Sequence, residues 1–146
     1  MAAKRLAGNI LLANSENVKF PAYRHKMDPK RVKGIVHLNA DTVSGAEFYS
    51  EAMWILPGED SGDLVQYDAH SHTWDELISF SGFNYDDIQD LGGEIEFTVE
   101  GKTYTITRSF AAFIPAGVQH GPRPSMRDLK RDERMRATDL RPMDEV

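Results

Sequence analysis

Three histidines and one glutamate have spacings that can place four metal ligands together. His70 and His72 are two residues apart, and side chains at this spacing point to the same face of a β-strand. Glu76 comes four residues after His72, and His120 follows the turn-forming sequence Pro-Ala-Gly. Three imidazoles and one carboxylate suit a divalent transition metal and leave coordination positions open for substrate or water. The pattern predicts a metal site for iron, manganese, nickel, cobalt, copper or zinc.

Each of these residues also has an ordinary structural interpretation. Histidines in strands and turns often serve packing alone, and Glu76 could be a surface acid or one that only supports a ligand. Asp75 is the alternative carboxylate, but its position in a strand has the opposite parity to that of His72. We expect His37 to be a half-buried strand histidine and His25, in a basic segment, to be exposed.

The elements that must position these residues are predicted to be short β-strands. The clearest pattern is a hairpin over residues 94–107, where apolar and polar residues alternate on both sides of Gly101. Many short strands separated by Gly/Pro turns indicate an all-β sandwich or barrel. We predict further strands at residues 34–39, 45–56, 63–70, 76–80 and 110–114, with shorter N-terminal segments at Ile10–Leu12 and Val18–Phe20.

The first histidine segment resembles the first motif of the cupin family. That motif consists of Gly, five residues, His-x-His, three or four residues, Glu, about six residues and Gly. This chain has His70-x-His72-x-x-x-Glu76, with Gly82 after five further residues. The leading glycine of the motif is absent.

The second histidine segment resembles the second cupin motif, which is Gly, five residues, Pro-x-Gly-x-x-His, three residues and Asn. Pro115-x-Gly117-x-x-His120 matches its centre. Ser109 stands at the position of the first Gly and Pro124 at that of the Asn, and neither position is a metal ligand.

The resemblance covers roughly residues 45–122. It implies an all-β double-stranded β-helix, or jelly-roll barrel, with His70, His72, Glu76 and His120 holding the metal inside. We assign residues 34–124 to this barrel, residues 1–33 to a basic extension, and residues 125–146 to a charged tail. Within this tail, residues 125–138 are either a short surface helix or a frayed segment. Residues 83–91 form a longer loop than the shortest cupins have. It is either a lid near the barrel mouth or a plain surface loop.

Composition excludes several other classes of protein. The 146 residues suit one domain and contain no cysteine, which removes disulfides, thiolate nucleophiles and cysteine–zinc sites. The net charge of −6 argues against nucleic acid as a partner, and residues 34–101 carry fifteen acids without a Lys or Arg. No segment is long and apolar enough for a membrane span or a secretory signal, so we expect a cytoplasmic protein without membrane association.

The resemblance implies a metal-dependent enzyme that acts on a small molecule, of the dioxygenase, lyase or isomerase class. The alternative is a cupin without catalytic activity that binds a metal and a small ligand, as a sensor or as a subunit of a larger enzyme. Small barrels of this kind commonly cover an open sheet face by pairing, so we expect a homodimer. No catalytic residue can be assigned, although four side chains could face the site: Tyr49, Met53, Trp74 and Gln119.

Overall fold

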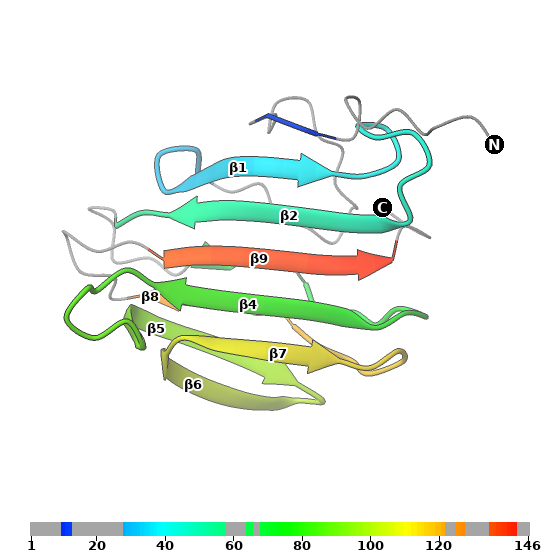
Figure 1. Ribbon diagram of the computed structural model, residues 1–146. Helices are drawn as coiled ribbons and strands as arrows, with labels where there is room; N and C mark the ends of the chain where they lie inside the picture. The colour runs from blue at the N-terminus through cyan, green and yellow to red at the C-terminus, as the bar shows by residue number, and fades with distance from the viewer. Residues whose placement is uncertain are drawn as a thin grey trace.

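The computed structural model describes residues 10–12, 28–57, 64–65, 68–121, 125–127 and 135–142 (Figure 1). Every regular element in this part of the chain is a β-strand, and every strand pairing is antiparallel. The strands are β1 (Val32–Leu38), β2 (Phe48–Ile55), β3 (Leu64–Val65), β4 (Glu76–Gly82), β5 (Asp90–Val99), β6 (Lys102–Arg108), β7 (Phe110–Ile114), β8 (Ser125–Arg127) and β9 (Met135–Pro142). The prediction of an all-β fold is confirmed.

The strands form two sheets with the orders β1-β2-β9-β4-β7 and β3-β8-β5-β6. β9 lies between β2 and β4, and all eight of its residues pair with β2 (Figure 1). Residues 125–127 and 135–142, expected to lie in a charged tail with a short helix or frayed segment at 125–138, are strands instead. The signal was missed because the buried side of β9 carries the small Ala137 and the acid Asp139, which give no apolar alternation.

The other predicted strands have mixed outcomes. The segments at 34–39, 45–56, 76–80 and 110–114 and the hairpin at 94–107 correspond to β1, β2, β4, β7 and the β5–β6 pair. The strand expected at 63–70 is present only at Leu64–Val65 among the described residues. Residues 10–12 form no strand, and residues 18–20 lie outside the described part of the chain.

One hydrophobic core fills one end of the space between the two sheets. Along β2 and β4 alternate residues are buried, which gives each strand an inner and an outer face. The core residues come from both sheets and from the strand that was expected to be a tail: Met53, Ile55, Ile78, Phe80, Leu91, Ile95, Phe97, Ile114 and Ala137. Their burial supplies the main stabilisation of the sandwich.

The loop after β4 lies away from the histidines. β4 begins at Glu76 and ends at Gly82, so the loop leaves from the end opposite to Glu76 (Figure 1). Arg108 donates a hydrogen bond to the side chain of Gln89 over 2.6 Å, and Ser109 donates to the carbonyl of Ile88 over 3.3 Å. The 83–91 segment is thus fastened to the connection between β6 and β7, at the end of β4 away from Glu76, and it does not cover the histidines.

The β5–β6 turn provides a test of the fold. Glu100 and Gly101 both have positive φ, 50° and 77°, as a two-residue type I′ turn requires, and Glu is poorly suited to this conformation. We predict that Glu100→Asn raises the free energy of unfolding by about 0.5–1 kcal/mol, because Asn tolerates positive φ. Gly101→Ala should lower it by about 1 kcal/mol or more. Urea denaturation measures both, and an unchanged or lower stability of Glu100→Asn would contradict the turn assignment.

Candidate metal centre

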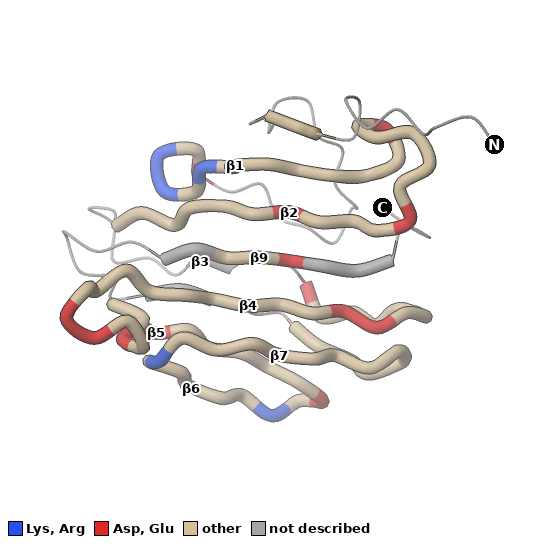
Figure 2. Tube along the Cα trace, in the orientation of Figure 1, with Lys and Arg blue, Asp and Glu red and all other residues tan. Residues whose placement is uncertain are grey.

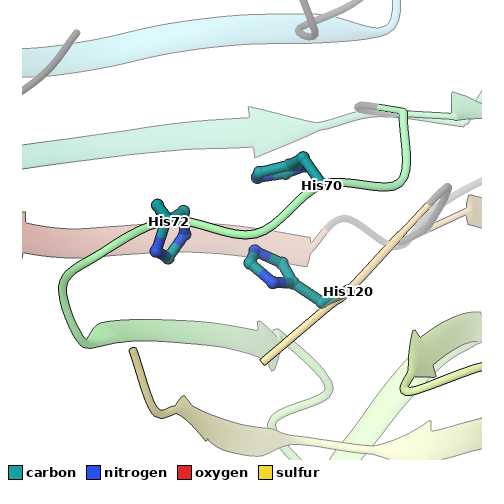
Figure 3. A group of neighbouring side chains, drawn as sticks. All are labelled: His70, His72 and His120. Atoms are coloured by element: carbon teal, nitrogen blue, oxygen red, sulfur yellow. The ribbon is translucent and has the colours of Figure 1, made fainter. Parts of the chain in front are cut away.

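Two segments that are far apart in the sequence meet at the histidines. His70 lies in the loop before β4, and His120 lies after the turn that follows β7. The backbone N–H of each donates a hydrogen bond to the carbonyl of the other, both over 2.9 Å. This short antiparallel bridge fixes the two motifs side by side, and Figure 3 shows the rings of His70, His72 and His120 turned toward one another.

The three rings form a compact group. The ring centroids of His70 and His120 are 4.3 Å apart, and those of His72 and His120 are 4.8 Å apart. One nitrogen from each ring lies within 4.8 Å of the others. The sequence predicted that these three side chains would lie together, and in the fold their rings are neighbours.

Backbone carbonyls determine which ring nitrogen is available in each histidine. Nδ1 of all three rings lies 2.7–3.0 Å from a carbonyl oxygen, which can only accept a hydrogen bond. Nδ1 must therefore carry the proton in the neutral rings, and Nε2 keeps its lone pair for a metal. The carbonyls belong to Asp68 for His70, Trp74 for His72 and Val118 for His120.

Glu76 brings a carboxylate to the same point. It is the first residue of β4, and its side chain lies on the inner face with only 4% exposure. Its Oε1 atom is 3.4 Å from Nε2 of His120 and 3.8 Å from Nε2 of His72. Glu76 thus lies beside two of the three grouped histidines, His72 and His120.

Two properties of the histidine side chains indicate that a metal cation fits this site. Nε2 of His72 is buried and accepts no hydrogen bond from any described residue. A buried acceptor without a partner costs about 1–3 kcal/mol, and a bound cation would remove that cost. Burial lowers the pKa of His70 below the usual 6.5, and the neighbouring rings of His120 and His72 add to the effect. Since a metal binds only the neutral imidazole, this lowered pKa favours the ligating form.

Two neighbours hold the centre in place. Trp74 is buried and stacks on the ring of His72, with centroids 3.5 Å apart and an angle of 10° between the planes. Asp75, the alternative ligand, instead accepts a hydrogen bond from the backbone N–H of Ala116 over 2.8 Å. Its exposed carboxylate thereby holds the turn that precedes His120. The sequence suggested that Trp74 faces the site but gave no sign of the role of Asp75.

Gly121 permits the close approach of the two segments. Its φ is +96°, and a Cβ at this position would lie 2.7 Å from the carbonyl oxygen of Asp68 and 2.9 Å from Cα of Ala69. A side chain would therefore push the two backbone segments apart. The turn itself contributes a further link, because the N–H of Gly117 donates to the carbonyl of His72 over 2.7 Å.

The remaining sequence candidates have other positions. Tyr49 is fully buried on the inner face of β2, Met53 belongs to the hydrophobic core, and Gln119 is exposed. His37 is not half-buried, as expected, but only 2% exposed. Burial of His37 could not be foreseen, because it depends on the partners that β2 provides.

Comparisons with known proteins give structural similarities only. No family model matches the chain, and no curated protein matches it. A conserved protein of unknown function from Streptococcus pyogenes superimposes over 94% of this chain and 98% of its own, with 13% identity and a TM-score of 0.46. KdgF from Halomonas sp. covers 92% and 94%, with 13% identity and a TM-score of 0.43. An RmlC-like cupin from Shewanella frigidimarina covers 90% and 94%, with 17% identity and a TM-score of 0.45.

Within the described residues no helix is long and apolar enough to cross a membrane. The chain's own residues agree with the resemblance to the two cupin motifs. The His-x-His…Glu segment and the Pro-x-Gly-x-x-His segment occur in the cupin order, and a backbone bridge joins His70 to His120. Two antiparallel sheets contribute the strands around this group, as the resemblance implied.

Proposed function

We propose that the chain is a cupin and that it binds one divalent transition metal through His70, His72, Glu76 and His120. The observation that carries the proposal is that all three histidines adopt the same tautomer. In each ring Nδ1 donates to a backbone carbonyl, which leaves Nε2 available to bind a metal. Glu76 adds the single negative charge, so a bound divalent ion would keep a net charge of +1. Such a centre attracts an oxyanion.

We further propose that the protein is an enzyme that acts on a small molecule, of the oxidoreductase, lyase or isomerase type. A bound metal would supply Lewis-acid or redox chemistry at its open positions. The chain's own residues orient the ligands and exclude water: Trp74 covers one face of His72, and the buried Glu76 lies against the rings from β4. The alternative is a cupin that binds the metal and a ligand without catalysis. In that case the ligand would be released unchanged.

We also propose that the protein is a homodimer formed by the outer face of its five-stranded sheet. Phe113 is 63% exposed there, and Leu77, directly opposite it on β4, is 39% exposed. Figure 2 shows that β7 carries no charged residue and that the charges of β4 lie only at its start. A two-fold interface brings one patch against itself, which an uncharged patch allows without repulsion. A second copy of this chain is therefore the partner that this face fits.

The first prediction concerns the ligands. Purified parent protein should contain close to one transition metal per chain, and His72→Ala should weaken metal binding by a factor of about one hundred or more. Asp75→Asn is the matched control, because it keeps the hydrogen bond to Ala116 and removes no ligand. Elemental mass spectrometry measures the metal content. Equal metal in the parent and in His72→Ala would show that the ligand assignment is wrong.

The second prediction separates catalysis from binding alone. The metal-loaded parent and His72→Ala are each incubated with a small-molecule extract of cells, which is then profiled by mass spectrometry. An enzyme should deplete at least one compound and form a product with the parent only. A compound that is retained by the parent but recovered unchanged would support the alternative without catalysis.

The third prediction concerns the spacing of the two motifs. Gly121→Ala should weaken metal binding about tenfold without removing a ligand, because the new Cβ would separate His70 from His120. Gly45→Ala is the control: it has a similar positive φ of +81°, but nothing lies within 4 Å of its added Cβ. Metal titrations of both variants test this. A similar loss of affinity in the two would mean that backbone strain, rather than the approach of the segments, is responsible.

The fourth prediction concerns the dimer. Analytical ultracentrifugation should show a dimer for the parent and a monomer for Phe113→Lys, because a lysine there would place two like charges at the interface. Tyr85→Lys changes an aromatic residue that is 91% exposed in the loop after β4, and it should remain dimeric. A monomeric parent, or a dimeric Phe113→Lys, would exclude this interface.

A further inference from the structure

The inner face of the five-stranded sheet changes from apolar to polar along its strands. At one end its residues belong to the hydrophobic core. Toward the end that carries Glu76, the inner positions become Tyr49 and Glu51 on β2, His37 on β1 and Asp139 on β9. Polar groups on the inner face beside a candidate metal centre could give hydrogen bonds to a polar ligand bound there.

His37 and Glu51 form the middle of this polar region. They are directly opposite each other on β1 and β2, and Nδ1 of His37 lies 3.8 Å from Oε2 of Glu51. Both are buried, with 2% and 6% exposure. The edge of the His37 ring also packs against Tyr49, at 4.7 Å between centroids and an angle of 87°.

A turn after β1 sets the proton position of His37. The side-chain oxygen of Asn39 accepts hydrogen bonds from the backbone N–H groups of Asp41 and Thr42, over 2.9 and 3.0 Å. The Asn39 amide nitrogen must then face Nε2 of His37, 3.1 Å away, and donate to it. The proton of the neutral His37 ring is thus placed on Nδ1, on the side of Glu51.

The strand register connects this pair to the metal centre. Glu51 is opposite Asp139 on β9, and Asp139 is opposite Ile78 on β4. Glu76 is two residues before Ile78 and therefore shares its inner face. Two strand spacings and two residues separate Glu51 from Glu76, which places their Cα atoms about 12 Å apart. A ligand bound at the metal centre would have to extend over about this separation to reach Glu51.

We propose that Glu51 accepts a hydrogen bond from the ligand that occupies the metal centre, and that His37 is the positioning residue for the Glu51 carboxylate. This inference rests on the proposed function. The metal end, with a net charge of +1, attracts an oxyanion, whereas the Glu51 end attracts a hydrogen-bond donor. The ligand class that satisfies both ends is a small carboxylic acid with a hydroxyl or an ammonium group at its far end.

The test uses Mn²⁺-loaded protein and matched acids. Propionate, butyrate, valerate and hexanoate are each compared with their terminal hydroxy and terminal amino derivatives, and displacement of metal-bound water is followed by proton relaxation. At one chain length or more, the parent should bind a derivative about tenfold more tightly than the plain acid. The hydroxy and amino series distinguish the two kinds of donor.

The variants separate ligand recognition from a structural role. Glu51→Gln should abolish the preference for the substituted acid while leaving the affinity for the plain acid unchanged. His37→Gln should reduce the preference without reversing it. Should Glu51→Gln fail to fold in a thermal unfolding assay, Glu51→Asp serves in its place. Because its carboxylate is one methylene shorter, the preferred acid should become one carbon longer.

The outcomes also distinguish this inference from the proposed function. A parent that does not bind Mn²⁺, or in which no acid displaces metal-bound water, overturns both. A parent that binds the acids without any preference for a terminal donor overturns only the role of Glu51. So does a preference that persists unchanged in Glu51→Gln or, if that variant does not fold, a preferred length that stays the same in Glu51→Asp.

Discussion

The candidate site depends on the pair of backbone hydrogen bonds between His70 and His120. These bonds join a loop that precedes β4 to a turn that follows β7, across fifty residues of sequence. The ring contacts all require this register, since a slip of one residue would turn the His70 side chain to the other side. The bridge itself depends on Gly121, because any side chain there would collide with residues 68 and 69. Backbone geometry, rather than side-chain attraction, therefore creates the centre.

The interior of the sandwich contains both apolar and polar side chains. Apolar residues at one end of the sandwich supply stability, with Ile95 and Phe80 completely buried. Polar residues occupy the other end, where each histidine of the centre obtains a backbone carbonyl for its Nδ1. Because backbone carbonyls orient the imidazoles, no additional charged side chain is needed for this purpose. The two kinds of residue meet along the strands, since the core residues Ile114 and Ile78 are opposite Glu76 and Asp139.

The sequence predicted which side chains lie together better than it predicted the fold's edges. His70, His72 and His120 form one group with Glu76 beside His72 and His120, although His70 and His72 lie in a loop rather than in the expected strand. The close spacing of His70 and His72 and the short Pro-x-Gly turn before His120 are local features that a sequence displays directly. β9 was missed since its inner residues are small or charged, and its position is determined by β2 and β4 rather than by its own pattern. The burial of His37 was missed for the same reason: Glu51 and Asn39, which contact it, are brought there by pairing and by a turn.

The central position of β9 has a consequence for how the protein is made. In the described part of the chain, the two strands beside it, β2 and β4, do not pair with each other and are joined through residues 135–142. During synthesis the sheet therefore remains in two separate pieces until those residues have left the ribosome. Contacts this distant in sequence form slowly, and open strand edges are exposed until they do. Chaperone protection of the nascent chain would matter most in that interval.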